Sequence, residues 1–161
     1  MAKKVKVKKT LVEQILTKAG VDHQGIQINA LEGELPSDYD RNHIFKTLAL
    51  LGDKTGPVIG IVPITEHLSE KKLAKISGNK KVAMIPQKDL EKTTGYIHGA
   101  NNPVGIRQKH NYPIFIDETA LELEKMIVSA GEVGHSIIIA PKDLANFVKA
   151  SFVDILEENN S

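Results

Sequence analysis

The sequence predicts a single mixed α/β domain, with a mixed sheet of six to seven strands surrounded by four or five helices. Three observations support this class. The 161 residues suffice for one domain with a substantial core. Short apolar runs typical of strands are interleaved with amphipathic helical segments along the chain. Some successive strands are joined by tight turns and others by helices, so antiparallel and parallel pairs should occur together.

The first predicted helix begins after the N-cap Thr10 and ends at Gly20. Residues 25–29 alternate in polarity like a half-buried strand. The acidic, turn-rich residues 30–40 form a predicted loop that leads into a short helix ending near His43.

Residues 44–51 and 57–62 are predicted strands joined by a hairpin turn at 52–56. The turn contains two glycines, a lysine and a threonine, which suggests a phosphate-binding loop as an alternative. However, the full spacing of such a loop is missing, and a strand rather than a helix follows it.

A helix capped by Ser69 and closed by Gly78 comes next, followed by a strand at 81–85 and a short helix at 87–92. Residues 93–107 are predicted to be a long loop with three glycines, one proline and two adjacent asparagines. A loop of this length in a compact domain is more often functional than idle, although a long surface turn is the alternative.

The last third contains a turn or short helix at 117–123 and a helix opened by Pro141. Three strands are predicted here: 113–116, 125–129 and 136–140. Ser129, Ala130 and Gly131 end the second of them, where a backbone N–H could point into a cleft and stabilise a carbonyl oxygen. A plain strand-to-turn transition is the alternative interpretation.

The composition narrows the function classes. There is no tryptophan, and aromatic residues make up only 4%, so the core must be mostly Ile, Val, Leu and Ala. The absence of cysteine excludes disulfides, a thiolate nucleophile and a zinc–thiolate site, and it fits a cytoplasmic protein. No apolar run reaches the about 18–20 residues that span a bilayer, and no secretory signal pattern follows the basic N-terminus.

Five of the 21 basic residues lie within residues 1–9, so the rest of the chain carries 16 basic and 20 acidic side chains. The expected organisation is a basic tail at 1–9, a domain at 10–156 and a polar tail at 157–161. The basic tail is either an arm that touches RNA phosphates or a solvated terminus. Any other RNA contact must come from a local patch.

Lys46 is the most unusual residue of the predicted strands. If the strand alternates, Lys46 shares a side with Leu48, and Thr47 lies opposite. A lysine on an apolar side is costly unless its amine has a partner or a cleft. The alternative is an edge-strand lysine whose amine reaches solvent.

Other catalytic patterns are absent from the sequence. None of the six histidines has a second histidine four residues away, so no metal site is predicted. No serine stands in a Gly-x-Ser-x-Gly context, although a spatial triad cannot be judged from spacing alone. Asp117 and Glu118 are adjacent acids to which nothing assigns an acid–base role.

A series of short motifs runs along the chain. In order, they are Lys46-Thr47-Leu48, Lys80-Lys81-Val82, Thr94-Gly95-Tyr96, Gly99, Pro103-x-Gly105, Pro113 to Asp117, Val128 to Gly131 and Lys142-Asp143-Leu144. In this order, the motifs resemble those of the YbaK/EbsC family, the free-standing relatives of the editing domain inserted in bacterial prolyl-tRNA synthetases. The resemblance covers roughly residues 8–156.

This resemblance implies a mixed sheet partly curled into a barrel, with no metal and no organic cofactor. It implies a trans-editing aminoacyl-tRNA deacylase that removes a mischarged small amino acid, most often cysteine from tRNA(Pro) or tRNA(Cys). The implied partner is the acceptor end of aminoacyl-tRNA, with a synthetase such as prolyl-tRNA synthetase as a further candidate and no membrane.

The resemblance also implies the site. Its catalytic residue is Lys46, because a lysine ammonium can hold the ester or stabilise the developing oxyanion. The implied substrate-binding residues are Thr47, Gly95, Gly99, Ala100, Gly105, Ser129, Ala130, Gly131 and Ser136. Two reactions are open: hydrolysis of the ester, and lyase-like release of a thiolactone from a cysteinyl ester.

Three positions differ from members known for cysteine. Ile28 lies where they have an aromatic residue, Ala100 where they have a second loop glycine, and Ser136 where they have an acid. Alanine or another small amino acid is therefore an alternative substrate. A non-catalytic regulatory or interaction module on the same fold is the alternative function.

Overall fold

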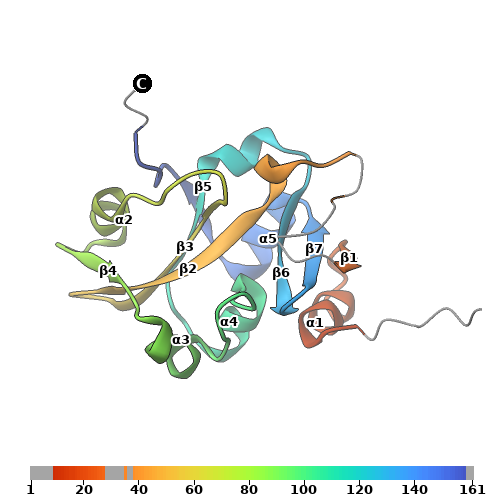
Figure 1. Cartoon of the computed structure of the whole chain (residues 1–161), viewed down its shortest axis with the longest axis horizontal. Helices are drawn as coiled ribbons and strands as arrows, with labels where there is room; N and C mark the ends of the chain where they lie inside the picture. Colours follow the sequence, from red (N-terminus) through yellow and green to blue (C-terminus); the bar gives the residue numbers. More distant parts are fainter. Residues whose placement is uncertain (1–8, 28–34, 36–37, 159–161) are drawn as a thin grey trace, which may run out of the picture.

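The computed structural model describes residues 9–27, 35 and 38–158, which form eight strands in two sheets (Figure 1). The smaller sheet is antiparallel and has the order β1 (Gln24–Gln27), β7 (His135–Ile139), β6 (Met126–Glu132). The larger sheet has the order β4 (Val82–Met84), β2 (Phe45–Gly52), β3 (Gly56–Pro63), β5 (Ile114–Asp117), β8 (Ser151–Val153).

The larger sheet combines both kinds of strand pairing, as predicted. β2 and β3 form the expected tight hairpin, with Phe45 opposite Pro63 and Gly52 opposite Gly56. The pairs β3–β5 and β5–β8 are parallel because helices lie between these strands in the sequence. The two sheets meet through a parallel bridge from Ile44 to Ile127, so the described strands curl partly without closing a barrel. The predicted mixed α/β class is confirmed.

The helices begin and end at the caps that the sequence supplies. Thr10 accepts a hydrogen bond from Glu13 N at 3.2 Å, and Ser69 accepts one from Lys72 N at 3.1 Å. Gly78 closes its helix in the left-handed conformation. The described α-helices are α1 (Leu11–Lys18), α2 (Glu70–Ser77), α3 (Gln87–Thr94), α4 (Pro103–Lys109) and α5 (Pro141–Val148), and the 3₁₀ turns are Arg41–His43 and Glu118–Glu122.

The main core lies between the two sheets, α1 and α5, and it is largely aliphatic, as the composition predicts. Its fully buried members include Ile61, Ile116, Met126 and Val128. A second cluster lies under α2, where Leu73 packs with residues of β2, β3 and the C-terminal segment. Burial of these side chains is the main stabilising contribution to the fold.

The structure corrects three local predictions. Residues 103–109 form α4 rather than a loop, because Asn102 caps the helix and Pro103 suits its first turn. Ser129 to Gly131 do not end their strand: β6 continues to Glu132 through a bulge, and the turn follows it. β8 is not predicted at all, because Ser151–Val153 is too short to show a period.

Several predictions lie outside the described residues. These are residues 1–8 of the basic tail, Ile28, most of the 30–40 loop and the last three residues of the polar tail. The division into a domain and two tails therefore stays a prediction. Within the described part of the chain, no helix is long and apolar enough to cross a membrane.

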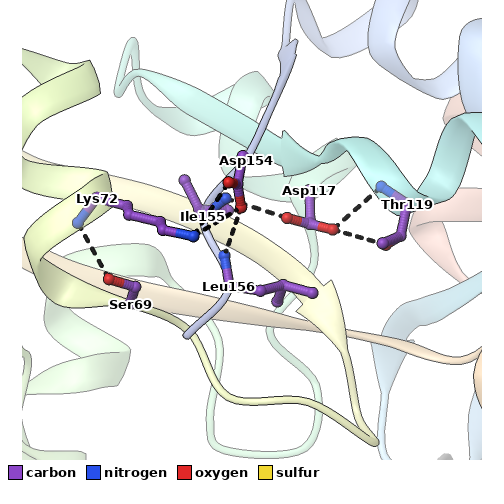
Figure 2. A network of polar contacts seen from close by, with 7 residues as sticks. All are labelled: Ser69, Lys72, Asp117, Thr119, Asp154, Ile155 and Leu156. Atoms are coloured by element: carbon purple, nitrogen blue, oxygen red, sulfur yellow. Dashed lines mark hydrogen bonds and ion pairs between the residues drawn. The ribbon is translucent and has the colours of Figure 1, made fainter. Parts of the chain in front are cut away.

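Asp117 joins three segments at the end of β5 (Figure 2). It is 1% exposed, and its Oδ1 accepts a hydrogen bond from Ile155 N at 3.1 Å. Its Oδ2 accepts from Thr119 N at 3.0 Å and from Thr119 Oγ1 at 2.6 Å. On the surface beside it, Lys72 pairs with Asp154 at 3.0 Å, which lowers the pKa of Asp154. Asp117 thus has a structural role.

We expect Asp117→Asn to destabilise the fold by about 1–3 kcal/mol, because the new amide NH₂ must face a buried N–H donor. Chemical denaturation measures the loss. Asp154→Asn is the matched control on the exposed side of the same network, with an expected cost below about 1 kcal/mol. Equal costs for the two variants would contradict the structural role of Asp117.

Candidate functional site

A cleft of about 290 Å³ opens beside β2. Its walls are mostly apolar, and a few polar groups converge on it, which is the usual character of a small-molecule site. The lining residues are Phe45, Lys46, Thr47, Leu48, Ala49, Ile64, Met84, Ile85, Gln87, Leu90, His98, Gly99, Asn101 and Ser129.

The cleft exists because one edge of β2 is only partly covered by a strand. β4 pairs with β2 from Leu50 to Gly52, and a last backbone bond joins Ile85 N to Ala49 O. Before that point, the Asn101 side chain takes the place of a strand and donates from Nδ2 to Thr47 O at 3.0 Å. Consecutive residues 45–49 all line the cleft, so it wraps around this edge and reaches both faces of the sheet.

Four of the predicted site residues meet in this cleft: Lys46, Thr47, Gly99 and Ser129. Lys46 and Leu48 are partly exposed whereas Thr47 is buried, which is the alternation predicted for the strand. Among the described residues, no carboxylate pairs with the Lys46 amine. Lys46 also borders a neighbouring groove of about 390 Å³. Within the described part of the chain, it therefore presents a cation without a carboxylate partner at the cleft.

The other predicted site residues do not line the cleft, and their roles stay predictions. Gly95 ends α3 in the left-handed conformation, and Gly105 lies in α4 against the Tyr96 ring. Ala100 and Ala130 are buried, and Gly131 adopts a φ of 90° on β6. Ser136 is buried on β7 opposite Ser129.

The loop that carries Gly99 and Asn101 is held by Asn102, which is completely buried. Its Oδ1 accepts from Gly105 N at 2.6 Å, and its Nδ2 donates to Ala100 O at 3.0 Å. One side chain therefore caps α4 and fixes the preceding turn. A Cβ on Gly105 would collide with Tyr96, so glycine is needed for the helix to pack on the loop.

The sequence pattern alone does not indicate Asn101 or the apolar wall formed by β4, Ile85 and α3. The wall residues Met84, Ile85 and Leu90 belong to elements whose positions the local pattern does not give. The two adjacent asparagines in a glycine-rich segment are the one feature of the sequence that indicates a structured turn here, since Asn is favoured at caps and turns.

Charged groups with shifted pKa values lie away from the cleft lining. The backbone N–H of Lys81 lowers the pKa of Asp53, and burial lowers the pKa of Arg107. Within the described residues, no group of three or more His, Cys, Asp or Glu side chains is arranged to hold a metal ion.

The fold and cleft define an α/β protein with a small apolar site at a sheet edge and a lysine at that site. A family model for the aminoacyl-tRNA editing domain matches residues 36–147, and the chain belongs to this family. The family predicted from the sequence motifs is thereby confirmed.

Individual relatives agree with this assignment. The chain is 37% identical over 162 residues to EbsC of Enterococcus faecalis, a candidate Cys-tRNA(Pro)/Cys-tRNA(Cys) deacylase, covering 96% of this chain and 98% of EbsC. A crystal structure of a hypothetical protein matches with a TM-score of 0.80 and 20% identity, covering 91% of this chain and 99% of that one. A candidate trans-editing enzyme for prolyl-tRNA synthetase matches with a TM-score of 0.67 and 20% identity, covering 93% and 82%. These two structures support the fold.

We expect Asn102→Ala to cost about 1–3 kcal/mol in the free energy of unfolding, because it removes a cap and leaves Gly105 N and Ala100 O unpaired. Asn102→Ser, which keeps an acceptor for the cap, should lose less. Denaturation measures both variants, and hydrogen exchange of the Gly105 amide should accelerate in the alanine variant. An unchanged exchange rate would show that Asn102 does not hold this loop.

Proposed function

We propose that this protein is a trans-editing aminoacyl-tRNA deacylase that removes a mischarged small amino acid in the cytoplasm. The observation that carries the proposal is that Lys46, which has no carboxylate partner among the residues the structure describes, lies at a small apolar cleft in a member of the aminoacyl-tRNA editing family. The similarity to EbsC, which covers nearly both chains, supports the same activity.

The chemistry suits a site without a strong nucleophile. An aminoacyl ester is already activated, so the site mainly needs to orient the carbonyl carbon and stabilise negative charge on its oxygen. In this proposal the Lys46 ammonium stabilises that oxygen, and water attacks the carbonyl carbon. The bond to the terminal ribose oxygen breaks, and the products are a free amino acid and uncharged tRNA.

For a cysteinyl ester, a second route is available. The substrate thiol attacks its own carbonyl carbon, the ester bond breaks, and the thiol proton ends on the ribose oxygen. The products are a cyclic thiolactone and uncharged tRNA. This route needs no protein nucleophile, and it uses Lys46 in the same way.

The cleft volume of about 290 Å³ supports a small amino acid. It lies at the lower end of small-molecule sites, and the walls offer Ala49, Leu48 and Met84 to an apolar or thiol side chain. A synthetase distinguishes side chains that differ by one methylene by only about 1–3 kcal/mol. A separate small cleft adds the missing discrimination. Delivery of the substrate by prolyl-tRNA synthetase is a further part of this proposal.

A deacylation panel tests the proposal. Cysteinyl-, alanyl- and prolyl-tRNA are incubated with the wild-type chain and with Lys46→Ala. We expect the wild type to release at least one amino acid, and Lys46→Ala to be slower by roughly 10²–10³-fold, the usual effect of removing one donor to an oxyanion. Product analysis distinguishes a free amino acid from a thiolactone.

Lys54→Ala is the matched control, because Lys54 lies on the exposed β2–β3 turn of the same hairpin. It should retain the wild-type rate. Equal rates for Lys46→Ala and wild type would reject the role of this lysine. A wild-type chain that leaves every ester intact while folded would reject the deacylase activity and favour the non-catalytic module.

A further inference from the structure

Two buried polar atoms beside the cleft have no hydrogen-bond partner among the described residues. They are Thr47 Oγ1 and Asn101 Oδ1, and each residue is only 8% exposed. Both residues line the cleft. A buried polar atom without a partner is unfavourable, and natural structures rarely keep one without a reason.

The hydrogen bond from Asn101 to the backbone of Thr47 determines which of the two Asn101 amide atoms has no partner in the described part of the chain. Its Nδ2 donates to Thr47 O at 3.0 Å, and the opposite orientation of the amide would place two oxygens against each other. The unpaired atom is therefore a hydrogen-bond acceptor. The Thr47 hydroxyl can also accept, so together the two side chains suit a ligand group that carries more than one donor.

These acceptors are separated from the cation of the site. The Thr47 and Lys46 side chains point to opposite faces of β2, and the cleft wraps around the strand edge between them. A ligand that spans this edge can place an electron-rich oxygen near Lys46 and a donor near Thr47 and Asn101. An aminoacyl ester has this arrangement, because its α-amino group is attached to the carbon next to the ester carbonyl.

We propose that Thr47 Oγ1 and Asn101 Oδ1 accept hydrogen bonds from the α-amino group of the aminoacyl ester and thereby direct its carbonyl oxygen toward Lys46. This inference rests on the proposed deacylase function and names the part of the substrate that these residues bind. The α-amino group is common to all aminoacyl esters. In this arrangement the apolar walls contact the side chain of the substrate amino acid. The acceptor pair binds only a substrate whose α-amino group is unblocked.

The test compares two substrates in three variants. The aminoacyl-tRNA that the wild type cleaves fastest is compared with its α-hydroxyacyl counterpart, which has nearly the same shape but fewer hydrogen-bond donors and no amine. We expect wild-type kcat/KM to favour the amine by roughly tenfold. Thr47→Val and Asn101→Ala should each lower kcat/KM on the aminoacyl ester by roughly three- to tenfold. The preference for the amine should shrink in both.

Thr47→Val separates binding from folding. It keeps the side-chain shape and removes a hydroxyl that has no hydrogen-bond partner within the described part of the chain, so its melting temperature should stay equal or rise. Thr17→Val, on the exposed surface of α1, is the matched control and should keep the wild-type preference. Asn101→Ala also removes the bond to Thr47 O, so its rates are read together with its melting temperature.

Distinct outcomes overturn distinct claims. An amine preference that is unchanged in Thr47→Val and Asn101→Ala would overturn the inference while the deacylase function stands. Losses of equal size on both esters would assign the two residues to the ribose or to the fold, and would overturn it as well. A wild-type chain that cleaves neither ester would overturn the proposed function and, with it, this inference.

Discussion

The incomplete cover of one edge of β2 is the constraint on which the site depends. A strand edge with free backbone groups must be paired or protected. β4 protects it only from Leu50 onward, and Asn101 protects it at Thr47. The cleft lies where this side-chain cover replaces a strand. Had β4 extended further, Lys46 would border a continuous sheet rather than a cavity.

The adjacent residues Asn101 and Asn102 have different roles in covering this edge of β2. Asn102 is directed inward and fixes the turn before α4 with two hydrogen bonds, of 3.0 and 2.6 Å. Asn101 is thereby placed against β2, where its Nδ2 donates to Thr47 O and its buried Oδ1 has no hydrogen-bond partner among the described residues. The precision of the site thus comes from a buried polar network rather than from regular secondary structure.

Features set by nearby residues could be predicted from the sequence. The caps at Thr10 and Ser69, the tight hairpin and the alternation around Lys46 all depend on contacts within a few positions. The motif order also led to the correct family. α4 was missed because its cap lies inside a glycine-rich segment, and β8 because its pairing is entirely long-range. The hydrogen bond between Asn101 and Thr47 joins residues 54 positions apart, so no local sequence pattern predicts it.

The position of β8 has a consequence for folding. This strand lies at the sheet edge, and Asp117 holds Ile155, two residues beyond its end. Its parallel partner β5 is distant in the sequence, because β6, β7 and α5 all lie between the two strands. Such a long-range parallel pair forms late in folding, so the outer edge of β5 stays open until these intervening elements have packed.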